Sequence, residues 1–180
     1  RLSLVGSEMC IRDSRYGYGD VEQILQAQQA FVAKLSGTPC PAVAAASKSP
    51  TTRFFQYLLA GMCDFYLGNI PQAMRNLALA GDNAWAAPAH INLADYHLFR
   101  GLALGSPEAV GNLADKLREL QALRERFGRW AGFNPATFRN KLLLIEGVIA
   151  KLEGDGLAAI RCFDQAQIAA TAAGFIHEQA

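Results

Sequence analysis

Residues 54–80 read FFQYLLAGMCDFYLGNIPQAMRNLALA, and residues 140–166 repeat their pattern as NKLLLIEGVIAKLEGDGLAAIRCFDQA. In each stretch, an apolar-periodic segment is followed by a glycine turn and a second apolar-periodic segment, so each predicts a pair of helices. Gly61 corresponds to Gly147, and Gly68-Asn69 corresponds to Gly154-Asp155, at a constant offset of 86 residues. An interval of this length leaves room for one looser helix pair between the two.

The repeat also predicts how the two helices of each pair pack. Glycine at 61 and 147 lets a second helix approach closely, and alanine at 73 and 159 is the small residue that we expect to be received there. Larger side chains at 77 and 163 are expected to fill the space toward the next pair. The packing residues of this prediction are Tyr57, Gly61, Ala73, Leu77, Ala80, Leu143, Gly147, Ala159, Phe163 and Ala166.

The rest of the chain is also helical in pattern, because apolar residues recur at three- and four-residue steps and no segment alternates as a strand does. We therefore expect an all-α fold, a tetratricopeptide-like α-solenoid of antiparallel helical hairpins. Expected helices cover about 20–35, 51–67, 71–80, 88–104, 107–127, 135–153 and 156–173, and a further one begins at Phe175.

Three regions follow from this pattern. Residues 1–14, RLSLVGSEMCIRDS, resemble read-through of a sequencing adaptor and are left out of the fold prediction. Residues 15–50 are expected to hold an N-terminal helix, with Asp20 as its N-cap, and a Pro/Ala/Ser linker. Residues 51–180 are expected to hold the repeats, truncated at the C-terminus. The expected apolar face of the N-terminal helix comprises Val21, Ile24, Leu25, Phe31, Val32 and Leu35.

Charge and composition argue against several classes of function. The chain has 17 Lys and Arg against 16 Asp and Glu, which does not predict a nucleic-acid partner. Polar residues interrupt every apolar run, so no membrane span is expected. The four cysteines are dispersed without zinc spacing, which is typical of a reducing, cytoplasmic compartment. The Gly-Lys pair of a phosphate loop does not occur in the sequence. We therefore expect no catalytic, cofactor-binding or metal-binding residue.

Two histidines were weighed as metal ligands. His90 and His97 are two turns apart on an expected helix, with Asp95 nearby. A metal site prefers histidines four residues apart or a third ligand close by, so ordinary solvated or groove histidines are the favoured interpretation.

The stretches 54–80, 85–104 and 134–180 resemble the helical region that follows the predicted ATPase domain in very large bacterial signalling proteins. These proteins join a serine/threonine kinase, a STAND-type ATPase, helical repeats, a GAF sensor and often a histidine kinase. No position here matches their kinase or nucleotide motifs, so ATP is expected only in the other domains of such a parent. The residues that carry the resemblance in the last stretch are Pro135, Phe138, Gly154, Asp155, Gly174, Phe175, Glu178 and Ala180.

The resemblance implies a non-catalytic scaffold or regulatory segment, which couples an ATPase module to the sensor or kinase modules of a multidomain signalling kinase. The alternative is a free-standing tetratricopeptide adaptor that binds a partner protein through its concave face. In both cases the partner is protein, and the inner positions of the expected groove are mainly apolar. The candidate interaction residues are Phe55, Met62, Phe65, Lys141 and Lys151.

Overall fold

The computed structural model of the chain describes residues 19–39, 47–88, 90–175 and 178. This part of the chain is helical throughout and contains no strand, which confirms the all-α prediction. Residues 1–14, which resemble a sequencing adaptor, lie outside the described residues. So do much of the expected linker and most of the helix expected from Phe175. The helices are α2 (Gly19–Ser36), α3 (Pro50–Tyr66), α4 (Ile70–Gly81), the short 3-10 helix η1 (Ala84–Ala86), α5 (Asn92–Leu104), α6 (Leu113–Phe133), α7 (Pro135–Glu153) and α8 (Gly156–Ala173).

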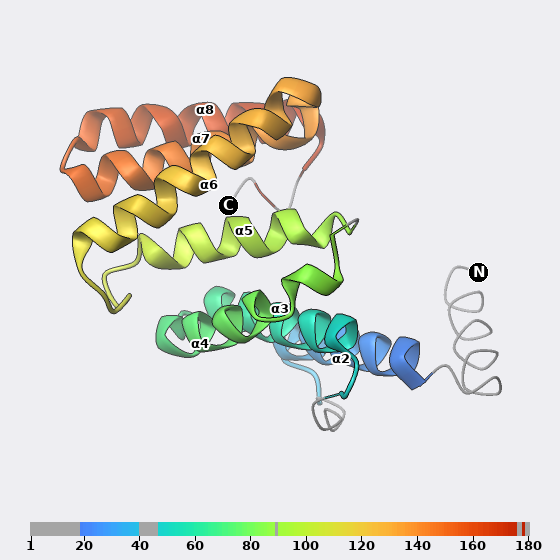
Figure 1. The fold of residues 1–180 in the computed structure, drawn as a ribbon. Helices are drawn as coiled ribbons and strands as arrows, with labels where there is room; N and C mark the ends of the chain where they lie inside the picture. The colour runs from blue at the N-terminus through green and yellow to red at the C-terminus, as the bar shows by residue number, and fades with distance from the viewer. Residues whose placement is uncertain (1–18, 40–46, 89, 176–177, 179–180) are drawn as a thin grey trace. The chain divides into compact units, whose positions relative to one another are not determined.

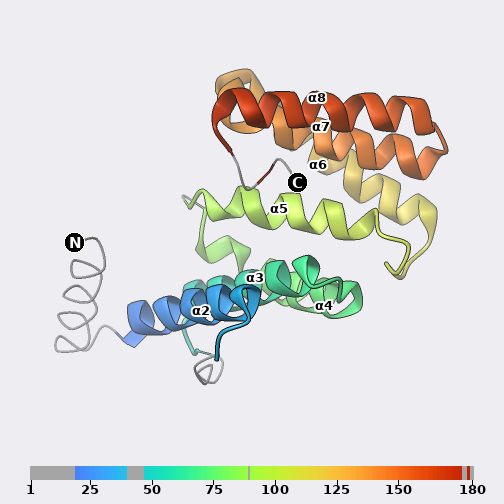
Figure 2. The same cartoon turned by 180° about the vertical axis from the view of Figure 1, so that it is seen from behind.

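The chain divides into two compact units, Arg1–Tyr96 and His97–Ala180. In the first unit, α2 packs on α3, and α3 pairs with α4. In the second unit, α7 lies between α6 and α8, as both views show (Figures 1 and 2). Each unit therefore contains one of the two predicted hairpins, α3 with α4 and α7 with α8.

The turns of the two hairpins have the same geometry. Gly68 and Gly154 both adopt the left-handed conformation, with φ of +76° and +86°, which a residue with a side chain rarely adopts. The amides of the following residues, Asn69 and Asp155, each donate to the carbonyl five positions earlier, at 2.8 and 2.9 Å. This is the Schellman pattern that ends a helix. The predicted correspondence of the two turns is confirmed.

The first helix of each hairpin begins at a proline, directly after a capping residue. Before α3, the Ser49 hydroxyl accepts a hydrogen bond from the amide of Thr52 at 3.5 Å. Before α7, the Asn134 side chain accepts from the amide of Thr137 at 3.2 Å. A proline at the first helical position loses no intrahelical bond, and the cap satisfies an amide that would otherwise have no partner. These local signals place the start of both hairpins.

A glycine in the first helix of each hairpin receives a large side chain from the second helix. A methyl group added to Gly61 would lie 2.9 Å from Cγ of Leu77 and 3.3 Å from its backbone nitrogen. A methyl group added to Gly147 would lie 2.5 to 2.9 Å from three ring carbons of Phe163. All of these distances are shorter than an ordinary van der Waals contact. Each hairpin therefore closes only because its glycine has no side chain.

The side chain nearest to each glycine is not the predicted alanine. Ala73 and Ala159 are buried in the same hairpins, at 0 % and 5 % exposure, but the atoms nearest to the glycines belong to the residues four positions later. Residues four apart share one face of a helix. The alanines therefore lie on the packed face, while the larger side chain one turn onward fills the space that the glycine leaves.

The buried face of α2 also differs from the prediction. Ala27, Ala30 and Ala33 are buried, whereas Val32 is 61 % exposed. Alanines allow the two helix backbones to come close, so α2 meets α3 with its small residues. Asp20 lies within the first turn of α2, and its carboxylate accepts hydrogen bonds from the hydroxyls of Ser47 and Thr52 at 3.3 and 3.1 Å. It therefore ties α2 to the beginning of α3 and is not the N-cap that we expected.

The helices between the hairpins begin later than predicted. Gly111, with φ of +123°, precedes α6, and the Asn112 side chain accepts from the amide of Asp115 at 2.8 Å. A left-handed residue followed by a cap prevents the helix from starting earlier. The helix then continues to Phe133, beyond the expected end at 127. Likewise, α5 begins at Asn92 and not at 88.

We expect Gly147→Ala to destabilise the chain by about 1 to 3 kcal/mol, because the new methyl group would overlap the Phe163 ring. Alanine otherwise favours a helix over glycine by about 1 kcal/mol. Gly128→Ala in α6 is the matched control, since no atom lies within 4 Å of its added Cβ, and it should be neutral or stabilising. Urea unfolding of both variants measures the difference. Equal effects of the two substitutions would contradict the close contact.

Candidate interaction surface

The candidate interaction residues lie in two different units. Phe55, Met62 and Phe65 are on α3, whereas Lys141 and Lys151 are on α7. Phe55 is 7 % exposed and Lys141 is 4 % exposed, so both lie in the interior and not on an open surface as expected. The exposed Lys151 donates from Nζ to the carbonyl of Gly105, the residue directly after α5, at 3.2 Å. Phe55 and Lys141 are therefore not available to a partner protein as predicted.

The packing residues are distributed over α3, α4, α7 and α8. Tyr57 and Phe163 are half-buried, and the other predicted packing residues are buried. None of them is exposed.

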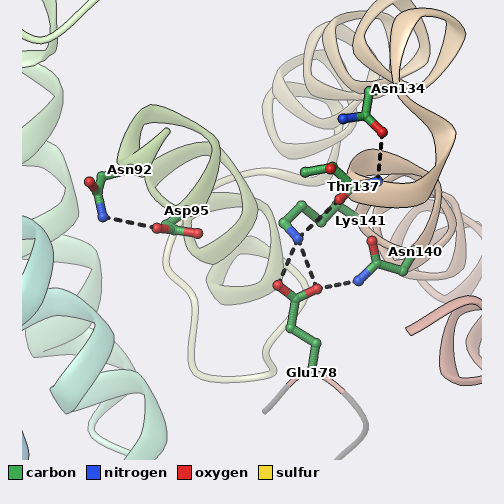
Figure 3. A network of polar contacts seen from close by, with 7 residues as sticks. All are labelled: Asn92, Asp95, Asn134, Thr137, Asn140, Lys141 and Glu178. Carbon is green, nitrogen blue, oxygen red and sulfur yellow. Dashed lines mark hydrogen bonds and ion pairs between the residues drawn. The ribbon is translucent and has the colours of Figure 1, made fainter. Parts of the chain in front are cut away.

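Lys141 is the centre of a buried polar network in the second unit (Figure 3). Its Nζ lies 2.6 and 2.9 Å from the two carboxylate oxygens of Glu178 and 3.3 Å from the carbonyl oxygen of Thr137. The Asn140 side chain donates from Nδ2 to the same carboxylate. The Phe175 ring lies 4.8 Å from the ammonium group. The lysine therefore has a carboxylate, a carbonyl and an aromatic face around its charge.

The sequence contained a partial signal for this network. Lys141 precedes an apolar run in α7, where a buried charge needs a counter-ion. Its partner, Glu178, is 37 residues away, and such a pairing has no local spacing rule. The lysine was singled out as a surface residue, and its ionic partner was missed.

A second cluster joins α5, α6 and α7 through the ring of Trp130. Its centroid lies 5.9 Å from that of His97, 5.4 Å from that of Phe127 and 5.4 Å from that of Phe138. The Arg126 guanidinium lies 6.0 Å from the same ring. Aromatic pairs at these separations stabilise beyond the area that they bury. This cluster holds together three helices of the second unit.

The two histidines have different surroundings from those expected. His90 precedes α5, so the two histidines do not share a helix. The His90 and Phe55 rings form an edge-to-face pair with their centroids 5.2 Å apart. Burial lowers the pKa of His97 to about 4, and nearby Arg126 adds to the effect. His97 is therefore neutral at pH 7. Within the described part of the chain, no three His, Cys, Asp or Glu side chains are grouped so that they could hold a metal ion.

Close contacts of α5 were also missed. Added methyl groups on Gly101 and Gly105 would overlap Ile145 and Val148 of α7. Gly101 lies in α5 and Gly105 directly follows its last residue, and this spacing of four residues was the available signal for a close contact. Beside them, Arg100 forms a two-pronged ion pair with Glu119 of α6, at 2.6 and 3.1 Å. The pair is partly exposed, so its contribution to stability is modest.

We expect His97 to make the free energy of unfolding depend on pH. The folded chain keeps His97 neutral down to about pH 4, whereas the unfolded chain protonates it near 6.5. Its contribution is therefore complete above pH 6.5 and is lost as the pH falls toward 4. Between these values the free energy of unfolding should fall by up to about 3 kcal/mol more in the unaltered chain than in His97→Gln. Urea titrations at several pH values test this, and equal slopes would exclude it.

Comparison with protein-family models, with curated proteins and with solved structures finds no match for this chain. No helix among the described residues is long and apolar enough to cross a membrane.

Proposed function

We propose that this chain is a non-catalytic scaffold built as a tetratricopeptide-like α-solenoid. The observation that carries the proposal is the same hairpin occurring twice, 86 residues apart, with the same left-handed glycine turn and the same glycine contact. Gly68 and Gly154 end the first helices, and Gly61 and Gly147 receive the second helices. Repetition of one hairpin is typical of proteins that stack hairpins to bury a continuous core.

Contacts between successive hairpins in the second unit support stacking. In a solenoid of this kind, the first helix of one hairpin contacts both helices of the preceding hairpin. Here α7 packs on α6, and its Ile145 and Val148 also meet Gly101 of α5 and Gly105 directly after α5. Both contacts agree with that arrangement.

The outer face of α8 supports a role in packing against other protein domains. Leu157, Ile160 and Ile168 are 72 %, 58 % and 69 % exposed. Large aliphatic side chains gathered on one helix favour association with another protein surface. We propose that this association couples an ATPase module to sensor or kinase modules of a cytoplasmic signalling kinase, and that ATP belongs to those modules.

The alternative is a free-standing adaptor that binds a partner protein through its concave face. The small apolar cavity between α2 and α3 does not favour this alternative, because it has room for only a few water molecules and not for a peptide. Three of its lining residues, Ala27, Ala30 and Cys63, are buried where the two helices pack together.

We expect no binding when magnesium ATP is titrated into the chain in a calorimeter, because nucleotide binding is assigned to other modules. A phosphate-loop ATPase under the same conditions serves as the positive control. A dissociation constant in the micromolar range would contradict the scaffold proposal and favour an enzyme.

The reading frame that surrounds the coding sequence distinguishes the two forms of the proposal. A phosphate-loop ATPase upstream, with a GAF or histidine kinase segment downstream, supports coupling within one protein. A short frame that encodes neither supports the adaptor.

A further inference from the structure

In each hairpin, residues that come later in the chain contact the same two positions of the first helix. In the first unit, Phe54 and Phe55 of α3 meet residues that come after α4. The Phe54 ring lies 6.2 Å from that of Tyr96, and the Phe55 ring lies 5.2 Å from that of His90. These contacts are edge-to-face and apolar.

The corresponding positions of α7, 86 residues later, are Asn140 and Lys141. These residues meet Glu178, which comes after α8. The place of contact is the same, but an aromatic contact has been replaced by an ionic one. The pair of positions at the start of the first helix therefore determines what can pack there.

The second site is built for a negative charge. Asn140 is 1 % exposed and Lys141 is 4 % exposed, so neither has access to bulk water. An ammonium group in such a place is strongly unfavourable without a counter-ion. Glu178 places both carboxylate oxygens within 2.9 Å of Nζ, so it supplies that counter-ion.

The amide of Asn140 gives an independent indication. Nδ2 donates to Glu178, whereas the buried Oδ1 has no hydrogen-bond partner among the described residues. Leaving a buried acceptor unpaired has a cost. The reverse orientation of the amide would place Oδ1 against the carboxylate, so the amide is oriented by the anion.

We propose that Asn140 and Lys141 form a carboxylate-recognition site that selects which side chain packs there on α7, and that Glu178 is its ligand. The hairpin α3 with α4 uses an aromatic pair for the same purpose. Two hairpins of one architecture thus recognise different partners by different chemistry. The inference concerns contacts within one unit and does not depend on the proposed scaffold function.

Chemical rescue with acetate tests the site in the full 180-residue chain. Glu178→Ala should lower the midpoint of thermal unfolding by on the order of 10 °C, because it leaves a buried cation unpaired. Acetate should raise that midpoint more than chloride does at equal ionic strength. Glu153→Ala is the matched control, since it removes an exposed carboxylate from the end of α7, and neither effect is expected there.

The double variant Lys141→Met with Glu178→Ala provides a second test, which applies even if Glu178→Ala alone does not fold. Without the cation, the lost carboxylate has no charge to neutralise, so the double variant should be more stable than Glu178→Ala and should not respond to acetate. The proposal is overturned if acetate acts no better than chloride on Glu178→Ala, or if the double variant is no more stable than the single one.

Discussion

The closure of each hairpin depends on a glycine that admits a large side chain. At Gly61 and Gly147 the second helix comes so close that Leu77 and Phe163 occupy the space where a Cβ would stand. Protein interiors are packed at the density of organic crystals, so such a contact tolerates little change of volume. The pairing of the helices, and everything that packs on each pair, depends on this close approach of the second helix to the glycine.

The same constraint recurs between hairpins. Gly101 and Gly105 bring α5 against Ile145 and Val148, so glycine serves both inside a hairpin and between neighbours. Aromatic and ionic contacts are added around these approaches. Trp130 joins three helices through its ring contacts, and Lys141 binds the carboxylate of Glu178. Backbone approach is thus common to the two hairpins, while the polar and aromatic contacts distinguish them.

Much of the helical framework could be predicted because its signals are local. Ser49 and Asn134 cap helices that begin at a proline, and Gly154 ends α7 where the sequence indicated. The predictions that failed concern side chains whose burial depends on residues far away in the chain. The three- and four-residue spacing of apolar residues along α2 favoured a face containing Val32, but tertiary packing buries the alanine face instead. Size matters more than hydrophobicity at that contact, because only small residues let two backbones come close.

The sequence by itself determined that the chain is helical, where most helices begin and end, and that one hairpin occurs twice, since caps, left-handed glycines and periodicity act over a few residues. Only the tertiary structure decided that Leu77 and Phe163 fill the glycine positions. It also decided that Lys141 is buried against Glu178 rather than exposed. These outcomes depend on which side chains meet across helices, and residues far apart in the chain meet according to volume and charge, which no local spacing encodes.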